Sequence, residues 1–176
     1  MQSIRFSVAT VAAAAVMAAG SAAFAQAVTD PQIAAIVVAA NQVDVDAGKV
    51  AEAKGTHPEV KAFGKQMVAD HAGVNKQATA LVTKLKVKPE DNPTAQSLKA
   101  GGAENVKKLS GLSGAAFDKA YIDHEIVYHQ QVLDALDKTL IPNAQNAELK
   151  ALLEKVRPAF VAHLNHAQTI QKALSK

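Results

Sequence analysis

Residues 113–129, SGAAFDKAYIDHEIVYH, decide the fold of this chain. Ser113 is a good helix cap, and the apolar side chains after it recur every three or four residues, the period of an amphipathic α-helix. Three ionisable groups, Asp118, Glu125 and His129, lie between the two edges of this apolar stripe. A charged group in a dry core costs several kcal/mol unless it is paired or bound to metal. The stretch therefore predicts a long helix with a polar site on its buried face.

Three other segments show the same helical period. The first runs from Asp30 to Lys54, with proline in its first turn and glycine after its end. The second begins at residues 57–59 and continues until Pro89, and the last is capped by Asn143 or Asn146. Their predicted ranges, with that of the helix described above, are 30–54, 58–85, 113–140 and about 146 to beyond 170, the last with a kink at Pro158.

Residues 87–112 are predicted to be a connection, because they contain Pro89, Pro93, Gly101 and Gly102. Residues 103–109 could form a short helix within it. No segment shows the alternation typical of a strand, and alanine is abundant, which favours helices packed on helices. The sequence therefore predicts an all-α protein, a four-helix bundle with a long connection between its second and third helices.

Each of the four helices places an ionisable group in its apolar stripe. At about 100° per residue, Asp44, His71 and His163 project into the stripes of their helices, as Glu125 and His129 do. All five lie near the middle of their helices, so their heights match whichever way the helices run. We therefore predict one shared site in the interior. Neighbouring groups expected beside it are Asp70, Asp118, Tyr121 and Tyr128, although both tyrosines could instead pack at the rim of the core.

Several phrases of the sequence occur in an order that resembles a known family. They are residues 59–63 (EVKAF), 67–71 (MVADH), 112–118 (LSGAAFD), and Arg157-Pro158 ahead of His163-Leu164. The chain resembles the family called domain of unknown function 4142 over nearly all of its length after residue 25. The resemblance implies an exported bacterial protein with a ferritin-like four-helix bundle. It implies no established activity.

Two hypotheses explain the inner polar groups, and the first is a metal site. Imidazole and carboxylate together suit zinc, iron, manganese or copper, and helical bundles build such sites from facing helices. The ligands would be Asp44, His71, Glu125, His129 and His163. Di-iron bundles use a Glu-x-x-His pair on each of two helices. This chain has no such pair, so the expectation is a single divalent ion or none.

The second hypothesis is a non-catalytic envelope or stress-response protein that acts through its outer surface. The inner groups would then form a hydrogen-bonded network that sets the helix register or responds to acid through histidine protonation. The chain contains no phosphate-binding glycine loop, no Gly-x-Ser-x-Gly and no His-Glu-x-x-His. The sequence therefore offers no argument for catalysis.

The first residues predict export. Arg5 precedes an apolar run over residues 6–19, and Ala23-Phe24-Ala25 has the small-x-small pattern of a signal peptidase site. We predict a removed signal peptide over residues 1–25 and a single periplasmic or secreted domain over residues 26–176. The chain has no cysteine, which excludes disulfides and thiolate ligands.

The charge pattern says little about partners. The net charge is +3 and the isoelectric point is about 9.1, but the lysines are scattered and have no aromatic residues interleaved with them. This pattern gives little support for nucleic-acid binding. It is compatible with loose contact with an anionic envelope surface, and it indicates no particular protein partner. No segment after residue 25 is apolar enough to predict a membrane span.

Overall fold

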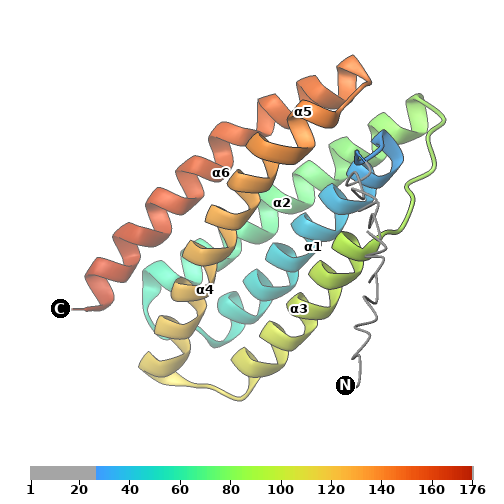
Figure 1. The fold of residues 1–176 in the computed structure, drawn as a ribbon. Coiled ribbons are helices and arrows are strands. Elements are labelled where there is room, and N and C mark those ends of the chain that lie inside the picture. Colours follow the sequence, from blue (N-terminus) through green and yellow to red (C-terminus); the bar gives the residue numbers. More distant parts are fainter. Residues whose placement is uncertain (1–26, 176) are drawn as a thin grey trace, which may run out of the picture.

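The computed structural model describes residues 27–175, and five long helices make up most of this range (Figure 1). These are α1 (Asp30–Lys54), α2 (Pro58–Lys84), α3 (Pro93–Ser110), α4 (Gly114–Ala135) and α6 (Ala147–Leu174). A π-helical turn, η1 (Leu136–Leu140), and the short α5 (Ile141–Asn143) extend α4. The all-α prediction is confirmed, while the predicted signal peptide lies outside the described residues. Within those residues, no helix is both long and apolar enough to span a membrane.

Several helix starts follow local signals in the sequence, although Ser113 at the start of α4 makes no side-chain capping hydrogen bond. Thr29 and Gln32 form a capping box at the start of α1, where each side chain accepts a hydrogen bond from the other residue's backbone N–H. Asn146 caps α6 by accepting hydrogen bonds from the N–H groups of Glu148 and Leu149. Such signals act within one turn, so the sequence predicts these starts well.

The predicted connection between the second and third helices is wrong over residues 93–102, because residues 93–110 form α3, and the short helix considered over residues 103–109 is part of it. Pro93 lies in the first turn, where its missing N–H costs nothing, and Asn92 caps the helix by accepting from the N–H of Ala95. Gly102 is not a break either, since a Cβ there would lie 2.7 Å from Val43 Cγ2. The glycine lets α3 pack closely on α1. The chain therefore has a fifth long helix, and a four-helix, ferritin-like bundle is not confirmed.

The predicted end of the 113–140 helix is also wrong, because helical backbone continues through Pro142 to Asn143. The preceding π-helical turn supplies the reason. It lengthens the hydrogen-bond step, so that the N–H of Ile141 bonds to the carbonyl of Leu136. A widened turn of this kind accommodates a proline, which has no N–H to donate. Pro158 likewise lies inside α6, and the helix continues on both sides of it.

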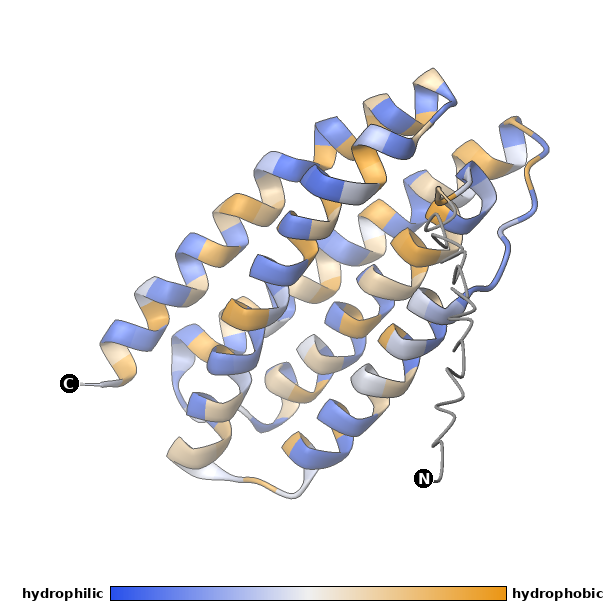
Figure 2. Cartoon of the chain, viewed as in Figure 1, coloured by the Kyte–Doolittle hydropathy of each residue, from blue (hydrophilic) through white to orange (hydrophobic). Residues whose placement is uncertain are grey.

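The helices enclose a core in two apolar parts. Figure 1 shows α1 beside α2 and α3, with α4 beside α6, and Figure 2 shows hydrophilic residues along their outer faces. One apolar cluster includes Val37, Leu133 and Phe160, and the other includes Phe63 and Tyr121. The ionisable residues of the predicted site lie in the sequence between members of the two clusters on each of four helices. A polar layer therefore divides the core.

Two glycines bring α1 and α2 into close contact. A Cβ on Gly48 would lie 2.7 Å from the carbonyl oxygen of Gly64, and a Cβ on Gly64 would lie 2.8 Å from that of Gly48. Real Cβ atoms do not approach backbone oxygen so closely. The separation of α1 and α2, and with it the position of each side chain between them, depends on these glycines.

We expect Gly64→Ala to destabilise the protein by about 1 to 3 kcal/mol, because the helices must move apart to admit the methyl group. Gly73→Ala is the matched control on the same helix, where a Cβ would meet nothing within 4 Å. The control should stabilise by about 0.5 to 1 kcal/mol, the usual gain from alanine in a helix. Urea denaturation measures both. Equal effects at the two positions would contradict the close contact.

Candidate metal centre

Five side chains from four helices form the polar layer of the core. His71 comes from α2, His163 from α6, Asp44 from α1, and both Glu125 and His129 from α4. Each is at most 3% exposed. Residues that are about 120 positions apart in the sequence are thus enclosed together, where charged or unpaired polar groups are costly. We call these five residues the core cluster.

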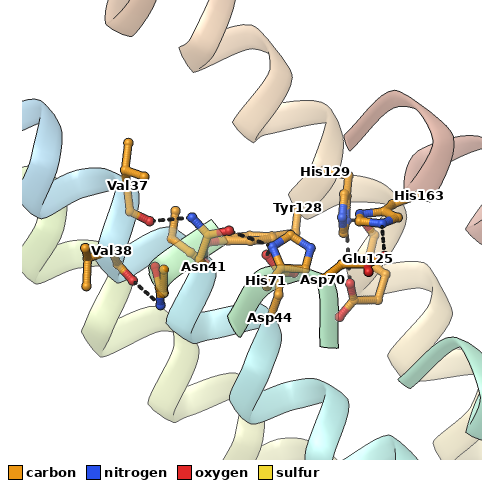
Figure 3. A network of polar contacts seen from close by, with 12 residues as sticks. Val37, Val38, Asn41, Asp44, Asp70, His71, Glu125, Tyr128, His129 and His163 are labelled. Carbon is orange, nitrogen blue, oxygen red and sulfur yellow. Dashed lines mark hydrogen bonds and ion pairs between the residues drawn. The ribbon is translucent and has the colours of Figure 1, made fainter. Parts of the chain in front are cut away.

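His71 is held by one ring nitrogen. Its Nδ1 lies 2.8 Å from Asn41 Oδ1 and 3.3 Å from Asp44 Oδ2 (Figure 3). The Asn41 amide donates to the carbonyl of Val37 at 2.7 Å, which turns its oxygen toward the histidine. Nδ1 of His71 is therefore the donor, and Nε2 carries the lone pair. That Nε2 is buried and has no hydrogen-bond partner in the described part of the chain.

The other two histidines are arranged in the same way. His129 Nδ1 donates to the carbonyl oxygen of Glu125 at 2.9 Å, and His163 Nε2 donates to Asp70 Oδ2 at 2.9 Å. The second nitrogen of each ring, Nε2 of His129 and Nδ1 of His163, is buried without a partner among residues 27–175. Each of the three rings thus has one nitrogen fixed by a hydrogen bond and one with its lone pair free.

The three rings face one another (Figure 3). Their centroids are separated by 5.2 Å for His71 and His163, 5.5 Å for His129 and His163, and 5.6 Å for His71 and His129. One nitrogen from each ring lies within 4.8 Å of the others, and donor atoms of Asp44, Glu125 and His129 form a second group within the same limit. Ligands of one ion are about 3 to 4 Å apart, since each bond is about 2 Å long. Small side-chain movements would bring these atoms to that spacing.

The two carboxyl groups of the cluster lie together in the core. All four oxygens of Asp44 and Glu125 are buried, and none accepts a hydrogen bond from the residues that the structure describes. Burial raises the pKa of Glu125 to about 8. Burial, and then the neighbouring Glu125, raise the pKa of Asp44 well above its usual range. A positive charge between them would oppose both shifts, because it stabilises the ionised form of each carboxyl group.

The histidines are held in their neutral form. Burial lowers the pKa of His129 to about 4, and burial followed by the charges of the other two imidazoles lowers that of His71. Burial also lowers the pKa of His163, although the nearby Asp70 opposes the shift. At neutral pH all three rings therefore keep an unprotonated nitrogen, the form that binds metal.

The four expected neighbours have different positions. Asp70 supports His163 as described above, and Tyr121 is fully buried, its pKa raised by burial and by the charges of the two carboxyl groups. Asp118 lies apart from the cluster, because its carboxylate accepts from the backbone N–H groups of Thr56 and His57 and caps the turn before α2. The ring of Tyr128 contacts that of His129 in an edge-to-face arrangement. Its hydroxyl group donates a hydrogen bond to the carbonyl oxygen of Ala40 at 3.0 Å.

Sequence reasoning missed two residues around the cluster. Asn41 orients His71 through a hydrogen bond. The sequence could have indicated this residue, because it is polar and lies three positions before Asp44 on the same face of α1. Phe160 has its ring 5.0 Å from that of His71 and 6.0 Å from that of His129. An aromatic residue in an apolar stripe is ordinary core, so nothing in the sequence marked Phe160.

Comparison with known proteins gives a family and nothing more. The profile of the family described as "Domain of unknown function (DUF4142)" matches residues 13–170. No curated protein and no solved structure matches the chain. The geometry of the core cluster is thus the main guide to function.

Proposed function

Because the chain belongs to the DUF4142 family, whose description assigns no function, we propose a function from the core cluster itself. The protein binds one divalent transition-metal ion through His71, His129 and His163, with Glu125 and Asp44 completing the set of ligands. The role is binding, for sequestration or sensing of the ion, and no catalytic step is proposed.

The three unpartnered imidazole nitrogens carry this proposal. A buried polar atom without a hydrogen bond costs about 1 to 3 kcal/mol, and the cluster contains three such nitrogens within one polar layer. In each ring the opposite nitrogen is fixed by Asn41, by the Glu125 carbonyl or by Asp70. Metal-binding histidines are oriented in the same way, by a hydrogen bond from the nitrogen that does not bind.

The charges favour a divalent ion. Three neutral imidazoles and two carboxylates have a total charge of −2, so an ion of charge +2 leaves the buried centre neutral. Mixed nitrogen and oxygen ligands suit zinc, iron, manganese and copper better than magnesium or calcium, which prefer oxygen alone. Without an ion, the carboxyl groups favour the protonated state, and this agrees with their raised pKa values.

The experiment uses untagged protein, analysed for bound metals and then melted with each ion. We expect about one ion per chain and a higher melting temperature, since an ion at 100 times its Kd stabilises by about 2.7 kcal/mol. Unchanged melting with zinc, iron, manganese and copper would contradict the proposal. It would favour the alternative that the protein acts through its outer surface, in the envelope or in a stress response. The hydrogen bonds of Asn41 and Asp70 would then serve to set the helix register.

We also infer that the ion is bound outside the cytoplasm, in the periplasm or after secretion. This rests on the sequence of residues 1–25 alone, with its basic residue, apolar run and Ala-Phe-Ala site. Fractionation of cells that express the full chain, with sequencing of the mature N-terminus, tests it. A chain that keeps its first 25 residues in the cytoplasm would contradict it.

A further inference from the structure

Where α2 contacts α6, the core cluster is hydrogen-bonded to a surface carboxylate, that of Asp70. All five members of the cluster are at most 3% exposed, whereas the side chain of Asp70 is 45% exposed. Its Oδ2 lies 2.9 Å from Nε2 of His163, whose Nδ1 is one of the unpartnered buried nitrogens. Figure 3 shows Asp70 beside His163. A single imidazole thus separates an exposed carboxylate from the interior of the cluster.

The described residues that border the cluster toward the bundle ends and toward α1 are apolar or more buried than Asp70. The apolar clusters that contain Phe160 and Phe63 border the polar layer along the bundle axis. Toward α1, Asn41 is 2% exposed and Tyr128 is bonded to the carbonyl of Ala40. The remaining carboxyl groups, Asp44 and Glu125, are buried and do not reach the surface.

The contact between α2 and α6 is also the easier one to loosen. Exposed side-chain hydrogen bonds join these helices near the cluster, at 3.3 Å between His166 and Gln66 and at 3.1 Å between Lys155 and Gln77. Between α1 and α2, by contrast, the glycine backbones touch. Breaking solvated hydrogen bonds costs little, because water replaces the partner. Separating closely packed backbones costs dispersion and burial.

We propose that Asp70 is the residue through which the ion reaches the core cluster, capturing the hydrated cation at the surface and passing it to His163. This rests on the proposed function. The carboxylate attracts the cation and replaces part of its water shell, and a rotation of His163 away from Asp70 exposes the cluster. Asp70 then also positions the His163 ring once the ion is bound.

The test follows Co²⁺ uptake by the untagged full chain in a stopped-flow instrument, using the visible absorption of the bound ion. Asp70→Asn keeps an oxygen that can accept from His163 but removes the charge. We expect its association rate constant to fall at least tenfold at low salt, the lower end of the range for electrostatic steering. Its dependence on salt should weaken as well. If Asp70 only positioned His163, the Asp70→Asn substitution would instead raise the dissociation rate constant of Co²⁺ and leave the association rate constant unchanged.

Two further variants complete the test. Asp70→Glu keeps the charge and should restore association to within a few fold of the wild type. Asp46→Asn changes the charge equally on α1, where the side chain is 48% exposed and pairs with Lys49, and should associate like the wild type. Equal association rates for Asp70→Asn and Asp46→Asn would overturn the path while leaving the metal site intact. A wild-type protein that binds neither Co²⁺ nor zinc, iron, manganese or copper would overturn the proposed function, and the path with it.

Discussion

Replacing His129 with alanine is expected to abolish metal binding and with it the rise in melting temperature that the ion causes. His129 belongs to both groups of converging donors, with His71 and His163 on one side and with Asp44 and Glu125 on the other. Its loss therefore removes a ligand from either arrangement. Changes to residues that merely support a ligand weaken metal affinity by about 10- to 100-fold, so loss of a ligand itself should exceed about 100-fold.

The measurement compares melting with and without the ion within each variant, because removing a buried side chain also lowers the stability of the metal-free protein. His124→Ala is the matched control, five residues earlier on α4. The ring of His124 stacks on Tyr128 with centroids 5.6 Å apart, and His124 is not part of the core cluster. It should keep the full metal-dependent shift. If His129→Ala kept that shift too, the proposed ligand set would be wrong.

Replacing Glu125 with glutamine is expected to stabilise the metal-free protein at pH 8 and to weaken the stabilisation by metal. Burial raises the pKa of Glu125 to about 8 from an ordinary value of 4.5. The folded protein therefore holds this proton more tightly than the unfolded chain does. The associated stability is fully present below pH 4.5 and is lost as the pH rises toward 8. A tenfold change in proton affinity corresponds to about 1.4 kcal/mol, so the loss at pH 8 is on the order of 4 kcal/mol.

Histidine has the opposite dependence on pH. The pKa of His129 is lowered to about 4 from 6.5, so the unfolded chain binds its proton more readily. That part of the stability is lost as the pH falls from 6.5 toward 4. The metal-free wild type should therefore lose stability on the alkaline side through Glu125 and on the acid side through His129. The Glu125→Gln variant should no longer lose stability on the alkaline side, but it should still lose stability on the acid side through His129.

Denaturation of chelator-treated protein between pH 5 and pH 8 measures both effects. At pH 8 the melting temperature of Glu125→Gln should exceed that of the wild type by roughly 8 to 16 °C without metal, at about 2 to 4 °C per kcal/mol. With the ion present, the wild type should instead have the higher melting temperature. Glu154→Gln makes the same chemical change at an exposed position on α6 and should alter stability by less than about 0.5 kcal/mol. If metal-free Glu125→Gln were no more stable than the wild type at pH 8, burial would not destabilise the ionised form of Glu125.

Most failures of the sequence-based predictions arise from contacts that a single helix does not reveal. Pro93, Gly102 and Pro142 are ordinary helix-breaking signals, yet each lies within helical backbone. Pro93 is harmless in a first turn, Gly102 is required by the approach of Val43, and Pro142 follows a π-helical turn. The second and third of these reasons depend on neighbouring structure rather than on the residue itself. Residues 93–110 could not be recognised as a helix that packs on α1 without knowing what they contact.

Most helix starts could be predicted from the amino-acid sequence, and so could the residues that each helix buries, including Asp44, His71, Glu125, His129 and His163. Caps act within one turn and an apolar stripe repeats every 3.6 residues, so both can be read along a single helix.

The tertiary structure alone decided how the helices meet. It brought one nitrogen of each of the three imidazoles within 4.8 Å of the others and engaged one nitrogen of each ring in a hydrogen bond. It also placed Asp118 outside the cluster, where it caps the turn before α2. Rotation and sliding between helices are set by contacts such as that of Gly48 with Gly64, which join distant parts of the chain and leave no periodic trace within either helix.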